Sequence, residues 1–171
     1  MNNIRALVAG MVLSTWISLA HAADSASALM RDAQLLADCT KALDSQCVIR
    51  LSDIEAYDRI SSRGFDFAKA QSVMYASMRK SHVKYVELSI SSPHEVFTLN
   101  GRQYAFVPYT WVTEVEGQDS ELRAYFVGIS RDHGSTWKFF DGAHVTSDNI
   151  RLIVPGYTNQ VLPNSTGSRF K

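Results

Sequence analysis

The sequence lacks an excess of charge of either sign. Its 171 residues hold 17 Lys and Arg against 17 Asp and Glu, so the formal net charge is zero. Proteins that bind nucleic acid or an anionic membrane surface carry a basic excess or a basic patch. The charge balance therefore predicts no nucleic-acid partner.

The sequence also lacks the short motifs that accompany common catalytic and cofactor sites. It contains no G-x-S-x-G, no phosphate-binding loop and no dinucleotide fingerprint. After residue 22 its histidines are His82, His94, His133 and His144. None of them is spaced i, i+4 on an expected helix, and none lies with Cys or Glu in a metal-ligand pattern. We therefore expect no metal and no cofactor.

Only one long apolar run occurs, and it lies at the N-terminus. Arg5 precedes an uncharged, mostly apolar stretch over residues 6–19, and the small-residue pattern Ala20-His21-Ala22 follows. This order is typical of a secretory signal peptide, and an ordinary buried helix is the alternative. We expect residues 1–22 to be removed, which leaves a periplasmic or secreted chain that begins at Ala23. No Cys lies near the cleavage point and no second run of about 20 apolar residues follows, so we expect no membrane anchor.

Cysteine is scarce, since Cys39 and Cys47 are the only two. An even number of cysteines in an oxidising compartment favours a disulfide. One continuous helix through both residues would keep the sulfur atoms apart, but the segment LDSQ between them is expected to break the helix. We therefore predict a disulfide between Cys39 and Cys47.

The sequence has no internal repeat, which bears on the one motif that is present. Residues 130–137 read SRDHGSTW and match S-x-D-x-G-x-T-W, a pattern that recurs from blade to blade in sialidase-type propellers. A single copy, in a mature chain of roughly 150 residues that suffices for one domain, excludes a propeller. The segment resembles the Asp box, which in the families that carry it is a folding element away from the catalytic centre.

The local physics of this segment predicts the turn of a β-hairpin. Its flanks are rich in β-branched and aromatic residues. Gly134 can supply a positive φ, and Asp132 can accept hydrogen bonds from turn amides. We therefore expect Ser130, Asp132, Gly134 and Trp137 to be structural residues of the turn, and a catalytic role is the alternative.

The remaining chain begins with helices. Apolar spacing predicts helices over residues 25–43 and 66–80. Between them, Ser52 or Asp53 is expected to cap a short helical turn.

Strand-like alternation takes over from residue 83 onward. Turns are expected at Asn100-Gly101, at residues 116–121 and at the Asp box. A last helical turn ends at Pro155, and residues 157–171 are expected to form a loose tail. Helices followed by consecutive, turn-linked strands predict an α+β fold with a mainly antiparallel sheet.

Two segments resemble the NTF2-like superfamily, and in particular its uncharacterised exported bacterial members. They are GRQYAFVPYT at residues 101–110 and RAYFVGISRDHGSTWKFFDG at residues 123–142. The resemblance implies two or three N-terminal helices packed on a strongly curved, mainly antiparallel sheet, a cone, over residues 23–156. It brings no agreed activity.

NTF2-like enzymes typically place an Asp or a His in the cone, so the resemblance makes Asp141, His144 and Asp58 the candidates for catalysis. Asp141 follows the last expected strand and His144 lies three residues later, so an acid–base pair is geometrically possible. In the alternative, Asp141 and Gly142 only close the strand and His144 lies in a solvated loop.

The strand over residues 104–112 is apolar on both faces. Tyr104 and Phe106 alternate with Tyr109 and Trp111, whereas a sheet covered on one side only alternates apolar with polar residues. The second face is therefore covered by the far wall of a curved sheet, by a ligand, or by a second copy of the chain in a homodimer. If a ligand occupies the cone, we expect Tyr104, Tyr109 and Trp111 to contact it.

Two functions of different classes follow from the sequence. The first is an exported module that binds a small ligand or a protein without catalysis, and the second is a small cone-pocket enzyme of the isomerase, dehydratase or hydrolase type. The missing catalytic motifs favour the first. A cavity of roughly 300 Å³ or more with Asp141 and His144 inside would favour the second.

Overall fold

The computed structural model describes residues 24–61, 64–81, 84–115, 117–158, 162–163 and 165–170. The predicted signal peptide lies outside these residues. Within them, helices come first and an antiparallel sheet follows, so the predicted α+β class is confirmed.

Four helices precede the sheet in the described residues, more than the two or three expected. The first covers residues 24–41, and the others are α2 (Ser45–Leu51), α3 (Ile54–Ile60) and α4 (Phe67–Lys80). Each of these three begins after an Asp whose side chain accepts a hydrogen bond from a backbone N–H of the first turn, namely Asp44, Asp53 and Asp66. The sequence does not predict α2, because LDSQ indicates only a break. In the structure Leu43, with a φ of 53°, ends the first helix and Asp44 caps the next.

The predicted disulfide is present. Cys39, near the end of the first helix, is bonded to Cys47 in the first turn of α2, with 5.8 Å between the two Cα atoms. Both cysteines are buried and belong to the same apolar cluster as Leu36 and Val48. The bond therefore fixes the direction in which α2 leaves the first helix.

Six strands form one antiparallel sheet in the described residues. They are β1 (Lys84–Ile90), β2 (Val96–Leu99), β3 (Arg102–Val115), β4 (Gln118–Ser130), β5 (Lys138–Asp141) and β6 (Thr166–Phe170). The main path runs β1-β3-β4-β5 and does not close into a barrel, while β2 also pairs with β3 and β6 with β4. In the predicted turn between β2 and β3, Asn100 and Gly101 have φ of 50° and 74°, the left-handed backbone that tight hairpins require.

The expected loose tail, residues 157–171, contains strand β6 at residues 166–170. Thr166 pairs with Arg123, and Phe170 pairs with Ser120. The segment TGSRF has little strand signal of its own. Its partner is the part of β4 that lies beyond the shorter β5, where the backbone groups of β4 would otherwise form an open edge.

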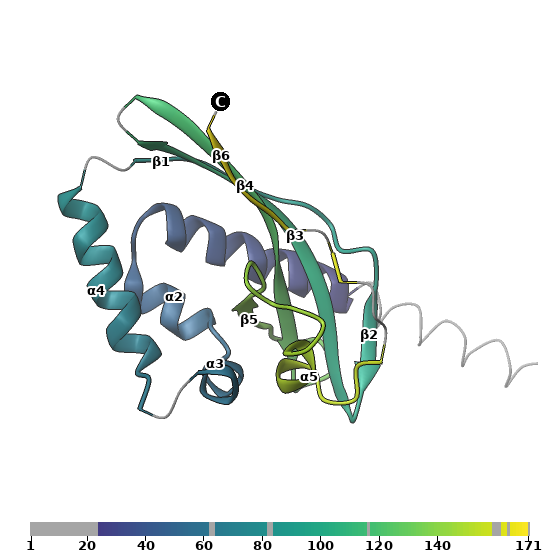
Figure 1. The fold of residues 1–171 in the computed structure, drawn as a ribbon. Helices are drawn as coiled ribbons and strands as arrows, with labels where there is room; N and C mark the ends of the chain where they lie inside the picture. The colour runs from purple at the N-terminus through teal and green to yellow at the C-terminus, as the bar shows by residue number, and fades with distance from the viewer. Residues whose placement is uncertain are drawn as a thin grey trace, which may run out of the picture.

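This chain covers both faces of its sheet. On one face Val107, Tyr109 and Phe126 belong to a core that includes the first helix, α2 and α4. On the other face Tyr104 and Tyr125 pack in a second core with α5 (Ile150–Ile153) and Tyr157. Figure 1 shows the long strands β3 and β4 passing over the N-terminal helices, and α5 near the lower end of β3. The cover near Tyr104 is therefore the chain itself, and the homodimer stays a prediction.

Candidate functional site

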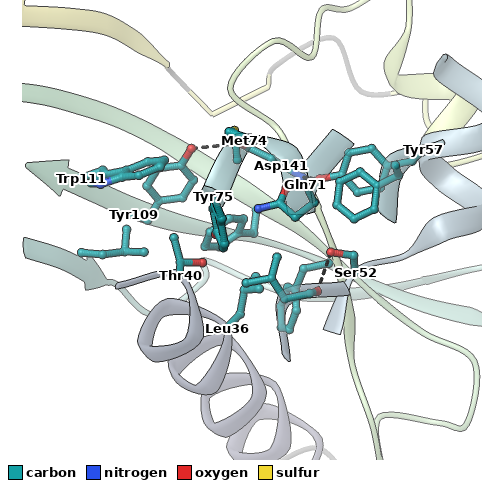
Figure 2. A pocket seen from close by; sticks show the side chains of 15 residues that line it. Leu36, Thr40, Ser52, Tyr57, Gln71, Met74, Tyr75, Tyr109, Trp111 and Asp141 are labelled. Atoms are coloured by element: carbon teal, nitrogen blue, oxygen red, sulfur yellow. Dashed lines mark hydrogen bonds between the residues drawn. The ribbon is translucent and has the colours of Figure 1, made fainter. Parts of the chain in front are cut away.

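A cavity and a groove lie beside each other between the helices and the sheet. The inner cavity has a volume of about 80 Å³ and lies between the first helix, α4 and the central strands. Residues that line it include Leu36, Thr40, Gln71, Tyr75, Tyr109 and Trp111. Figure 2 shows Tyr109 and Trp111 on one side of the cavity, Tyr57 on the opposite side and Asp141 between them.

The outer groove opens on the other side of Asp141. Its volume is about 400 Å³, and it is lined by α3, α4 and residues 140–149. Most of its lining is apolar, including Ile60, Phe65 and Val145. The inner cavity and the outer groove share five side chains, which form the wall between them: Tyr57, Phe67, Gln71, Met74 and Asp141.

The backbone holds Asp141 in this wall. It is the last residue of β5 and pairs with Phe126 of β4. Its N–H donates to the hydroxyl of Tyr57 at 3.1 Å, and the next residue, Gly142, donates its N–H to the carbonyl of Tyr125 at 2.8 Å. A Cβ atom on Gly142 would lie 2.4 Å from the ring of Tyr125. Only glycine fits there, so the turn after Asp141 depends on this close approach.

The carboxyl group of Asp141 receives two hydrogen bonds on one oxygen. The Tyr109 hydroxyl donates to Oδ1 at 2.9 Å, and the Ala143 N–H donates to the same atom at 3.0 Å. No hydrogen bond from the described residues reaches Oδ2. One carboxyl oxygen is thus held in place, and the other keeps its capacity to accept a bond.

Burial has the largest effect on the pKa of Asp141. It raises the pKa of Asp141 above its usual range, while the bonds from Ala143 and Tyr109 and the attraction of His144 act in the opposite direction. Burial, together with the Asp141 charge, also raises the pKa of Tyr109 and of Tyr57. Both phenols therefore remain protonated at neutral pH, and the Tyr109 proton is available to Asp141.

The structure brings together four of the residues predicted to form a site. Tyr109, Trp111 and Asp141 line the inner cavity, and Asp141 and His144 line the outer groove. No hydrogen bond joins His144 to Asp141 in the described residues, so the possible acid–base pair is not formed.

Two other candidates lie elsewhere. Tyr104 is 1% exposed and packs against Phe97 on the opposite face of the sheet. Consecutive residues of a strand point to opposite faces of the sheet. Tyr104 and Tyr109 are five positions apart, so they lie on opposite faces and cannot line the same cavity. Asp58 is exposed on α3 and lines neither the inner cavity nor the outer groove.

Sequence reasoning missed the polar residues that the helices contribute. Thr40, Tyr57, Gln71 and Tyr75 all line the inner cavity. A signal for one of them was present, because Gln71 lies four residues after Phe67 and three before Met74, on the apolar stripe of α4. A polar residue within such a stripe indicates either a buried hydrogen bond or a lined cavity.

The Asp-box turn, residues 130–137, lies away from the wall around Asp141. Asp132 accepts hydrogen bonds from the N–H and the hydroxyl of Thr136, at 3.0 and 2.7 Å, and these bonds lower its pKa to about 2. Gly134, with a φ of 88°, donates its N–H to Ser130 Oγ at 2.8 Å. Trp137 is 1% exposed, and its indole N–H donates to the Gly134 carbonyl at 3.2 Å. These hydrogen bonds all lie within the turn.

The described parts of the chain contain neither a metal-binding cluster nor a membrane-spanning helix. In those parts, no three His, Cys, Asp or Glu side chains gather closely enough to hold a metal ion. No helix within them is long and apolar enough to cross a membrane.

Comparison of the chain with models of protein families, with curated proteins and with solved structures finds no significant match.

Proposed function

We propose that the chain is an exported NTF2-like module that binds a small, mostly apolar molecule in the outer groove, with one polar group of that molecule held at Asp141. Helices followed by a bent antiparallel sheet, with a cavity and a groove between them, support the NTF2-like assignment. The disulfide is compatible with export.

The observation that carries the proposal is the outer groove. Small-molecule sites in proteins have volumes of roughly 300–1,000 Å³ and are lined by apolar and aromatic side chains with a few polar groups. The groove of about 400 Å³ has this size and this lining, with Asp141, His144 and Gln71 among its polar residues. A molecule that fills it would bury its apolar part against Phe65 and Ile60.

A variant that fills the groove tests the proposal. Ala70 lines the outer groove on α4, whereas Ala76 is exposed on the same helix and lines neither the groove nor the inner cavity. We expect the neutral apolar dye N-phenyl-1-naphthylamine to bind wild type and Ala76→Trp saturably, with an increase in fluorescence. Ala70→Trp should abolish this binding. Equal binding by both variants would contradict the proposal.

A second candidate function is an enzyme that transfers a proton. Asp141 and His144 both line a groove larger than the roughly 300 Å³ expected for such a site. Burial raises the pKa of Asp141 toward the range in which a carboxyl group acts as an acid or a base. The absence of a hydrogen bond between the two residues keeps this candidate second.

Proton exchange separates the two candidates without knowledge of the substrate. A general base at Asp141 would accelerate deuterium uptake at the α-carbon of a simple ketone, such as cyclohexanone, in heavy water. The binding module should leave this uptake, followed by NMR, at the rate seen with Asp141→Asn. Faster uptake with wild type would favour the enzyme.

A further inference from the structure

Among the described residues, Asp141 is the only Asp, Glu, His, Lys or Arg that lines the inner cavity, and no Lys or Arg lines either the cavity or the outer groove. The other ionisable candidate, His144, lines the outer groove but not the inner cavity. A carboxylate at this wall therefore has no cationic side chain bonded to it among the described residues. A buried carboxylate without a bonded cation is unfavourable, so the site is suited to a ligand that brings a positive charge.

The hydrogen-bond geometry of the carboxyl group fits the same kind of ligand. Tyr109 and Ala143 both donate to Oδ1, which leaves Oδ2 to accept from a ligand. An ammonium group has three donors and no acceptor, and its bonds to a carboxylate are about twice as strong as those between neutral groups.

The lining of the inner cavity adds a second attraction for a cation. Seven of its 15 lining residues are aromatic: Tyr57, Phe67, Tyr75, Tyr109, Trp111, Phe126 and Phe139. The faces of aromatic rings attract ammonium groups within about 6 Å, and more strongly where water is excluded. The cavity of about 80 Å³ is too small for a whole drug-sized molecule but has room for a small polar head group.

We propose that this site takes a molecule with a primary ammonium group on an apolar body, with the ammonium group bonded to Asp141 at the inner cavity and the body in the outer groove. The inference rests on the proposed function and adds the chemical class of the ligand. Asp141 lines both spaces, so a ligand bonded to its carboxyl group lies next to each of them.

Binding of a ligand changes the affinity of the Asp141 carboxyl group for a proton. The titratable groups that face Asp141 are Tyr57 from α3, Tyr75 from α4, Tyr109 from β3, Tyr125 from β4 and His144 from the following loop. Burial raises the pKa of each of these tyrosines, so none supplies a charge at neutral pH. An ammonium ligand favours the ionised carboxylate, and binding at a pH below the pKa of Asp141 therefore releases a proton.

Three probes of similar shape and different charge test the inference: 2-phenylethylamine, 2-phenylethanol and phenylacetate. Isothermal titration at pH 8 should show the amine binding at least about tenfold more tightly than the alcohol, and phenylacetate more weakly than the alcohol. In Asp141→Asn the advantage of the amine should disappear while the alcohol still binds. Asp119→Asn, which removes an exposed carboxylate at the tip of the β3–β4 hairpin, should retain the advantage.

The pH dependence of wild type provides a test that does not rely on the fold of a variant. The advantage of the amine over the alcohol should shrink as the pH falls through the raised pKa of Asp141, by up to about tenfold per pH unit below it. An advantage that stays constant as the pH is lowered from 8 to 3, below the ordinary pKa of an Asp side chain, would overturn the inference.

The outcomes separate this inference from the proposed function. Equal or tighter binding of the alcohol overturns the ammonium ligand and leaves the binding module in place. If the naphthylamine dye binds and none of the three probes does, the ammonium ligand is also overturned and the binding module stands. If neither the dye nor any probe binds, both proposals fail.

Discussion

Asp32 in the first helix accepts a hydrogen bond of 2.9 Å from the backbone N–H of Trp137, a residue 105 positions further along the chain. The other oxygen of the same carboxylate accepts a bond of 2.9 Å from the Arg31 side chain. Asp32 is buried, and the backbone of Trp137 is the point at which the Asp-box turn enters β5. This single carboxylate therefore joins the first helix to the far end of the sheet.

Removing that carboxylate should destabilise the fold. We expect Asp32→Ala to lower the free energy of unfolding in urea by about 1.5–3 kcal/mol, because it leaves a buried N–H without an acceptor. Asp38→Ala on the same helix removes an exposed carboxylate paired with Lys41 and should change the free energy by less than about 0.5 kcal/mol. Equal losses in the two variants would contradict a specific role for Asp32.

The Asp-box turn should stabilise the fold. Trp137→Ala removes a fully buried ring and should cost about 3–5 kcal/mol. Asp132→Ala should cost about 1–2 kcal/mol, since the Thr136 N–H loses its acceptor within the turn. Thermal and urea unfolding measure both losses. If Asp132→Ala instead loses ligand binding at full stability, the turn is part of a site.

Asp141 should make stability depend on pH in the sense opposite to an ordinary carboxylate. Its folded pKa lies above 3.8, the ordinary value for an Asp side chain. The folded state therefore binds the proton more tightly than the unfolded state, and this contribution is complete below about pH 3.8 and is lost as the pH rises through the folded pKa. Urea unfolding of wild type and Asp141→Asn from pH 3.5 to 8 should show the variant gaining relative to wild type as the pH rises. A difference that is independent of pH would rule out the raised pKa.

The disulfide should support both the fold and the site. Cys39 and Cys47 flank a short loop, so reduction should cost about 2–3 kcal/mol. Thr40 and Val48, which follow the two cysteines, line the inner cavity. We therefore expect the double variant Cys39→Ser and Cys47→Ser to bind 2-phenylethylamine, whose ammonium group is proposed to lie at the inner cavity, more weakly than wild type, as measured by isothermal titration. Unchanged affinity and stability would show that packing alone holds these helices.

The sequence predicts local features of this fold better than it predicts the site. The Asn100-Gly101 turn, the Asp-box hairpin and the amphipathic stripe of α4 each depend on residues close together in the chain, and all three elements are present. The bond between Asp32 and Trp137 and the wall around Asp141 depend on segments far apart. No local pattern distinguishes a buried Asp from an exposed one before those segments are placed.

The same limit explains the placement of the aromatic strand. Its two apolar faces are correctly read from alternation, but the sequence does not say what covers each face. Tyr104 is covered by α5 and Tyr157, and Tyr109 lies by the cavity. The covering segment after residue 142 is short and has only four helical residues, Ile150–Ile153, so its own pattern is too brief to indicate a cover.

The two covers of the sheet also set an order of events during synthesis. The helices that cover the Tyr109 face precede every strand in the chain, whereas α5 and Tyr157 follow β5. A chain that has emerged only as far as residue 142 therefore holds a complete hairpin of β3 and β4 with Tyr104, Tyr125 and Val127 bare. Such an apolar surface is what chaperones and proteases recognise. Docking of α5 then covers this apolar surface and removes it from the reach of chaperones and proteases.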